Sequence, residues 1–133
     1  MRFLGALVAL VLLGCPWLAC REALSAAPAD CPGDSVAVVA TTSPDGPQFS
    51  WAPACPIALL TAQTDSTSWS VRSDSDRIIP PVRYGQMPVG ATVASGTPPL
   101  VHGDTVTVSV WRTYSAGLHA GVVGPAGTLT FVY

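Results

Sequence analysis

Four cysteines, two histidines and a short acidic run are the residues of this 133-residue chain whose types could do chemistry. Cysteine can form disulfides or bind metal, while histidine and aspartate can bind metal or transfer protons. The spacing of these residues excludes the common catalytic and metal-binding patterns. No Cys-x-x-Cys, His-x-x-x-His or Gly-x-Ser-x-Gly sequence occurs, so neither a zinc site nor a serine-hydrolase nucleophile is indicated.

The histidines and the acidic run are better interpreted as turn residues. His102 and His119 both lie in turn or loop contexts without further ligands at short spacing. The Asp-Ser-Asp segment at 74–76, with Asp65 nearby, has the hard oxygen ligands that calcium prefers. It lacks the glycine and glutamate of a calcium-binding loop, which favours a solvated turn. Glu22 is the only glutamate, and we expect no catalytic residue, metal or cofactor.

The N-terminus has the layout of an export signal. Arg2 precedes an apolar run from Phe3 to Leu13, which then stops at Gly14. This run is too short to cross a bilayer, which needs about 20 apolar residues. We therefore expect residues 1–14 to be a signal peptide and the remaining chain to lie outside the cytoplasm.

The end of the apolar run resembles the bacterial lipobox, whose cysteine is lipidated and becomes the new N-terminus. Leu-Leu-Gly-Cys at 12–15 carries the resemblance, which implies lipidation of Cys15. Cys20 is the alternative, and ordinary cleavage near 23–25 would instead release a soluble protein. Several acyl chains give stable membrane attachment. Residues 15–34 would then be the anchor site and a flexible tether, with the protein facing the periplasm or the exterior.

The other two cysteines, Cys31 and Cys55, are predicted to form a disulfide in the exported domain. They flank a predicted β-hairpin whose strands, 36–41 and 47–51, surround the turn Ser-Pro-Asp-Gly at 43–46. In an antiparallel hairpin the start of the first strand lies beside the end of the second, so both cysteines fall at the open end. An oxidising compartment permits the bond. Two free buried thiols are the alternative.

Alternation of apolar and polar residues predicts an all-β domain without helices. Val106, Val108 and Val110 would face the core, with Trp111 on the opposite face. About seven short strands separated by turn residues are typical of a β-sandwich, here a single domain over 35–133. Gly-Pro-Ala-Gly at 124–127 is interpreted as one of these turns. The expected strands are 36–41, 47–51, 57–62, 69–72, 105–114 and 128–133, with short edge candidates at 82–84 and 92–94.

Two segments are similar to fibronectin type III domains, which are immunoglobulin-like β-sandwiches. Phe-Ser-Trp-Ala-Pro at 49–53 looks like the second strand of that family, whose tryptophan packs between the sheets. The segment 99–108 is similar to the family's Leu-x-Pro-Gly-x-x-Tyr turn before the sixth strand. His102 stands where proline is usual, and Val106 replaces the tyrosine. The resemblance implies an adhesive or spacing module.

Composition narrows the possible partners. Only 11% of residues are charged, lysine is absent and the net charge is -2, so no basic patch for nucleic acid exists. Trp111 is a possible aromatic contact for a sugar or protein, beside Tyr84 or Tyr114, unless it packs under a loop. The expected partners are a membrane, through the lipid, and an envelope protein or polysaccharide.

The expected function is therefore that of a non-catalytic, lipid-anchored cell-envelope protein with one β-sandwich interaction or structural module. The alternative is a secreted binding domain for carbohydrate or protein, without a lipid anchor. An enzyme with an unrecognised site is a weaker third hypothesis.

Overall fold

The protein is described by a computed structural model over Cys31 and residues 33–96, 98–114, 118 and 120–133. The predicted signal peptide, both candidate lipidation sites (Cys15 and Cys20) and His119 lie outside these described residues. Within them the regular elements are all strands, and no helix occurs. The prediction of an all-β fold is confirmed.

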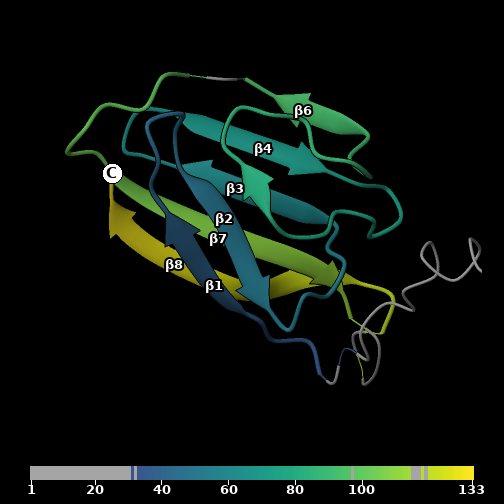
Figure 1. The fold of residues 1–133 in the computed structure, drawn as a ribbon. Coiled ribbons are helices and arrows are strands. Elements are labelled where there is room, and N and C mark those ends of the chain that lie inside the picture. Colours follow the sequence, from purple (N-terminus) through teal and green to yellow (C-terminus); the bar gives the residue numbers. More distant parts are fainter. Residues whose placement is uncertain (1–30, 32, 97, 115–117, 119) are drawn as a thin grey trace, which may run out of the picture.

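In the described part of the chain, eight strands form two antiparallel sheets (Figure 1). One sheet has the order β1-β2-β5 and lies in front of the other, which has the order β6-β4-β3-β7-β8. The count exceeds the expected seven because both short edge candidates pair, β5 with β2 and β6 with β4. The strands are β1 (Ala37–Thr41), β2 (Gln48–Ala52), β3 (Leu59–Gln63), β4 (Ser68–Arg72), β5 (Val82–Arg83), β6 (Val93–Ser95), β7 (Thr105–Thr113) and β8 (Val123–Val132).

The core fills the space between the two sheets, as in a sandwich. On β7 the three alternating valines predicted to face inward are fully buried. Phe49 of β2 meets Trp69 of β4 with ring centroids 6.5 Å apart, and it meets Phe131 of β8 at 6.2 Å. These aromatic contacts join the two sheets directly. The other buried apolar side chains include Trp51, Ile57, Leu60, Val71, Ile78 and Val82.

The segment 124–127 was predicted to be a turn, and that prediction is wrong because the segment lies inside β8. A bulge leaves Ala126 without a register partner, since Val110 pairs with Gly127 and Trp111 with Pro125. Proline is tolerated there because β8 is the outermost strand of its sheet, where an N–H is not needed for a further pair. Glycine at 127 leaves room for the Val36 carbonyl, which a Cβ would meet. Local turn chemistry was therefore overridden by pairing with β7.

The predicted disulfide between Cys31 and Cys55 is present, with the two Cα atoms 5.7 Å apart. Cys55 is completely buried, and its carbonyl oxygen accepts a 2.7 Å hydrogen bond from the indole N–H of Trp51. At the same end the buried guanidinium of Arg112 donates to the carbonyl oxygen of Gly33 at 2.9 Å. The segment before β1 is thus held to the loop after β2 and to β7.

Candidate functional site

Trp111, the predicted aromatic contact, lies on the outward face of β7 and is half-buried. Tyr84, one proposed neighbour, instead packs its ring against Trp69 at a centroid distance of 4.9 Å. The other proposed neighbour is Tyr114, whose hydroxyl donates a hydrogen bond to the carbonyl of Pro125. Pro125 is the register partner of Trp111. The indole N–H of Trp111 is buried, and no described residue accepts a hydrogen bond from it. Trp111 therefore offers part of its ring, and not its N–H, to a ligand.

The acidic segment 74–76 is engaged in local structure. Asp74 forms an exposed ion pair with Arg72 at 3.3 Å. Asp76 accepts hydrogen bonds from the backbone N–H and the hydroxyl of Thr113, at 2.8 and 2.9 Å. Across the described residues, no three histidine, cysteine or acidic side chains are grouped so as to hold a metal ion. The Asp76 carboxylate therefore fastens this loop to β7.

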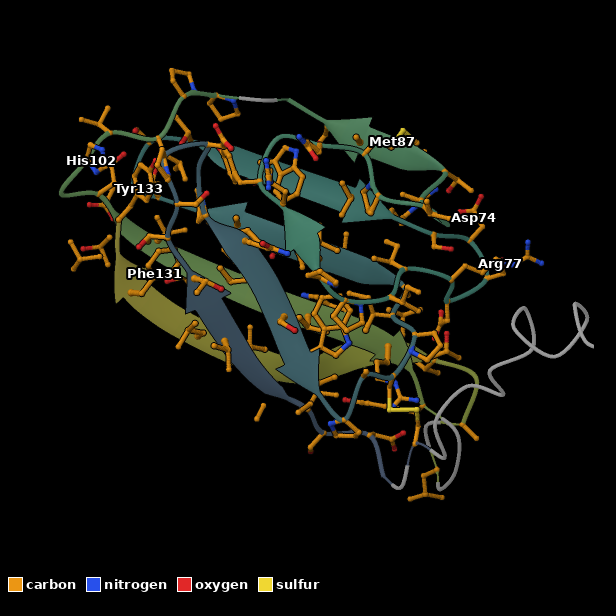
Figure 2. The ribbon with its side chains drawn as sticks, viewed as in Figure 1. Asp74, Arg77, Met87, His102, Phe131 and Tyr133 are labelled. Carbon is orange, nitrogen blue, oxygen red and sulfur yellow. A yellow bond between two sulfur atoms is a disulfide. The ribbon has the colours of Figure 1, made fainter. Side chains whose placement is uncertain are left out.

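A shallow pocket of about 360 Å³ lies at the end of the sandwich opposite the disulfide, at the β1–β2 turn. The rings of His102 and Tyr133 stack beside it, with centroids 4.7 Å apart and planes 12° from parallel (Figure 2). A tight turn fixes this pair. The Asp104 carboxylate accepts a hydrogen bond from the Val101 N–H, and the Gly103 N–H donates a hydrogen bond to the Tyr133 carbonyl. The lining residues are Thr42, Ser43, Pro44, His102, Val132 and Tyr133.

Tyr84 lies between this end and the core. Its hydroxyl donates to the carbonyl of Pro98 at 2.7 Å, and burial raises the pKa of Tyr84 above the ordinary tyrosine value of 10.0. Burial penalises the charged phenolate, so the folded protein holds a proton that the unfolded chain releases.

Deprotonation of Tyr84 is therefore expected to lower the free energy of unfolding at alkaline pH. The stabilisation that neutral Tyr84 provides is fully present below a pH of about 10, which is the pKa in the unfolded chain. It is lost as the pH rises from there through the raised pKa of the folded protein. Urea unfolding of the wild type and Tyr84→Phe at stepped pH measures this effect. The wild type should lose more stability between about pH 9 and 11 than the variant does. Equal losses of stability in the wild type and Tyr84→Phe would contradict the prediction that Tyr84 causes the effect.

The most regular polar surface is the outward face of the five-stranded sheet. One row of five hydroxyl side chains crosses all five strands, because the register aligns them as direct neighbours. A second row with one amide crosses four strands beside it. The first row is Ser95, Ser70, Thr61, Ser109 and Thr128, and the second is Ser68, Gln63, Thr107 and Thr130. We call these two rows the hydroxyl face.

Two hydrogen bonds within the hydroxyl face show that the side chains of each bonded pair point the same way. The hydroxyl oxygens of Ser70 and Ser95 are 2.7 Å apart, and those of Thr107 and Thr130 are 3.1 Å apart. Arg72 is the only exposed charged residue in these five strands, and it lies outside both rows beside Asp74. The face is therefore broad, polar and uncharged.

The hydroxyl face was not predicted from the sequence. Alternating Ser or Thr in β4, β7 and β8 marks polar outward faces, but strand alternation alone does not say which residues lie side by side. Comparisons with protein-family models, curated proteins and solved structures find no match to this chain. No helix among the described residues has the length and hydropathy needed to span a membrane.

Proposed function

We propose that this chain is an exported, non-catalytic module of a bacterial cell envelope, held at a membrane by lipid on Cys15. The observation that carries export is the disulfide between Cys31 and Cys55. Structural disulfides persist in oxidising compartments and are rare in the cytosol of mesophiles. This bond lies in the folded domain and is independent of the leader, so two separate features of the chain support the same location.

The polar groups near the core support a role without catalysis. Ser73 is buried, and its hydroxyl accepts the backbone N–H of Arg77 at 3.1 Å. Asp76 is occupied by Thr113, as described above. Arg112 donates through Nη1 to the carbonyl oxygen of Gly33, while its buried Nε has no acceptor among the described residues. A catalytic acid, base or nucleophile has to keep its reacting atom free for a substrate, whereas these groups hold loops and termini in place.

We assign the sandwich to the fibronectin type III-like, immunoglobulin-like type. Support comes from Trp51, which lies in the second strand and is only 3% exposed between the sheets, as the resemblance implies. Consecutive strands also move from one sheet to the other, with β1-β2 in the first and β3-β4 in the second. Val106, in place of the family tyrosine, is fully buried.

Anchoring through the N-terminus would attach the domain to the membrane by its disulfide end. The chain enters the described domain at Cys31, at the disulfide end, whereas His102 and Tyr133 lie at the other end (Figure 2). The pocket end is then the end farther from the attachment point, and the hydroxyl face lies along the side of the domain. Both surfaces are open to envelope partners.

Lipid attachment is tested by feeding expressing bacteria a labelled fatty acid and following the label on this protein. We expect the wild type and Cys20→Ser to carry label in the membrane fraction, and Cys15→Ser to carry none. An inhibitor of the lipoprotein signal peptidase should stall processing of the wild type. Unlabelled wild-type protein in the medium would contradict the anchor and favour the secreted alternative. Loss of label only in Cys20→Ser would move the anchor to that residue.

A further inference from the structure

We infer that the hydroxyl face binds a neutral polysaccharide chain that lies across the strands. This inference deepens the proposed function, on which it rests, by naming the class of partner. Its site is the outward surface of β6, β4, β3, β7 and β8, which faces away from the three-stranded sheet (Figure 1).

The row across five strands has the dimensions of an extended polymer site. Neighbouring strands lie about 4.8 Å apart, so the four steps from Ser95 to Thr128 cover about 19 Å. Each hydroxyl has one donor hydrogen and two acceptor lone pairs. The pair Ser70 and Ser95 uses one donor between its two members, which leaves acceptor capacity on both. Thr128 donates to Ser109 at 3.5 Å, so two of the five hydroxyls donate within the row. The row therefore presents acceptor lone pairs at regular intervals, together with the remaining donors, to a chain of sugar hydroxyls.

The absence of charge on the hydroxyl face argues against a polyanion as its ligand. Nucleic acids and other polyanions are bound through cationic contacts, and neither row holds a charged residue. Arg72, just outside the rows, is balanced by Asp74 at 3.3 Å. A neutral polymer rich in hydroxyl groups matches both the charge and the hydrogen-bonding character of this surface.

Trp111 supplies the apolar part of the site. It follows Ser109 by two residues on the same face of β7, and it lies in the register row of Leu59 and Pro125. Its buried N–H leaves a ring surface as the exposed part. Aromatic rings combine a large apolar area with a rigid shape, and binding sites typically pair such area with a few placed polar groups. An apolar face of a sugar ring can rest there while its hydroxyls meet the adjacent row.

The test is co-sedimentation of the full exported chain, with its disulfide intact, with insoluble cellulose, chitin and β-1,3-glucan. Heparin-agarose serves as the polyanion. The face variant is Thr61→Val with Ser109→Ala, and the matched control is Thr41→Val with Ser50→Ala on β1 and β2 of the other sheet. Thr128→Arg is a second face variant at an exposed position, which keeps the test open if the double variant fails to fold.

We expect the wild type to bind at least one of the three neutral polymers with little dependence on salt. The face variants should raise the Kd by about tenfold or more, since two hydroxyls are removed or the face is blocked. The control should stay within about twofold of the wild type, in line with surface changes that remove no contact.

Four outcomes would overturn the inference. They are no binding to any neutral polymer, equal weakening in the control, binding only to heparin, and loss of binding in His102→Ala, which would place the ligand in the end pocket. The lipid test is separate. If Cys15→Ser loses its label but still sediments with a neutral polymer, binding does not need the lipid, and the hydroxyl face is supported as the site. If the wild type carries no label and still sediments, only the anchor fails.

Discussion

Replacing Cys31 and Cys55 together by alanine is expected to lower the free energy of unfolding by about 3–4 kcal/mol. The two cysteines are 24 residues apart, and the chain-entropy estimate for a loop of this length is in that range. Alanine is preferred to serine because Cys55 is completely buried, where a hydroxyl would add a cost of its own. Urea unfolding followed by tryptophan fluorescence gives the difference.

Reduction of the wild-type protein is the control for this measurement. Treatment with a thiol reductant should bring the wild type close to the double variant and should leave the variant unchanged. A loss below about 1 kcal/mol would contradict the prediction, because the bond would then restrict the unfolded chain very little. The same experiment measures how far the domain depends on an oxidising compartment.

Trp69→Ala is expected to be as damaging, with a loss of about 3–5 kcal/mol. Trp69 is only 1% exposed and is the largest fully buried side chain, and its ring contacts Phe49 and Tyr84 from the three-stranded side of the core. Truncation removes apolar area and leaves a cavity that neighbouring strands cannot close. Thermal and urea unfolding measure the loss.

Two further variants separate packing from a general effect of substitution on a strand. Trp69→Phe keeps a ring in the core and should cost clearly less than alanine. Val132→Ala, at a position 67% exposed on β8, should change stability by less than about 0.5 kcal/mol. A Trp69→Ala protein as stable as Val132→Ala would mean that the sheets are not held together by this cluster.

Features set by local sequence were predictable for this chain. Strand alternation found the inward valines of β7, since side chains of a strand alternate by geometry. The β1–β2 turn and the cysteines on either side gave the hairpin and its disulfide. Both depend on residues close in the chain, where turn chemistry and alternation act directly.

Features set by pairing between distant strands were not predictable. The segment 124–127 has the composition of a turn, yet β7 extends it into a strand across a bulge. The hydroxyl face depends on contacts such as Ser70 with Ser95, 25 residues apart, and Thr107 with Thr130, 23 residues apart. A shift of one residue in any of these pairings would break the rows, and a single sequence does not specify that register. Trp111 was placed on the correct face, but its buried N–H depends on surroundings beyond its own strand.

The irregular middle of β8 has a consequence for self-association of this domain. Unpaired outer strands attract strands of other molecules, which is a common start of aggregation. Here Pro125 presents no N–H, and the Ala126 carbonyl already accepts the Val36 N–H at 2.9 Å. The bulge also twists the strand away from a straight template. Copies of this domain can therefore reach high concentration without joining into fibrils through the middle of this edge.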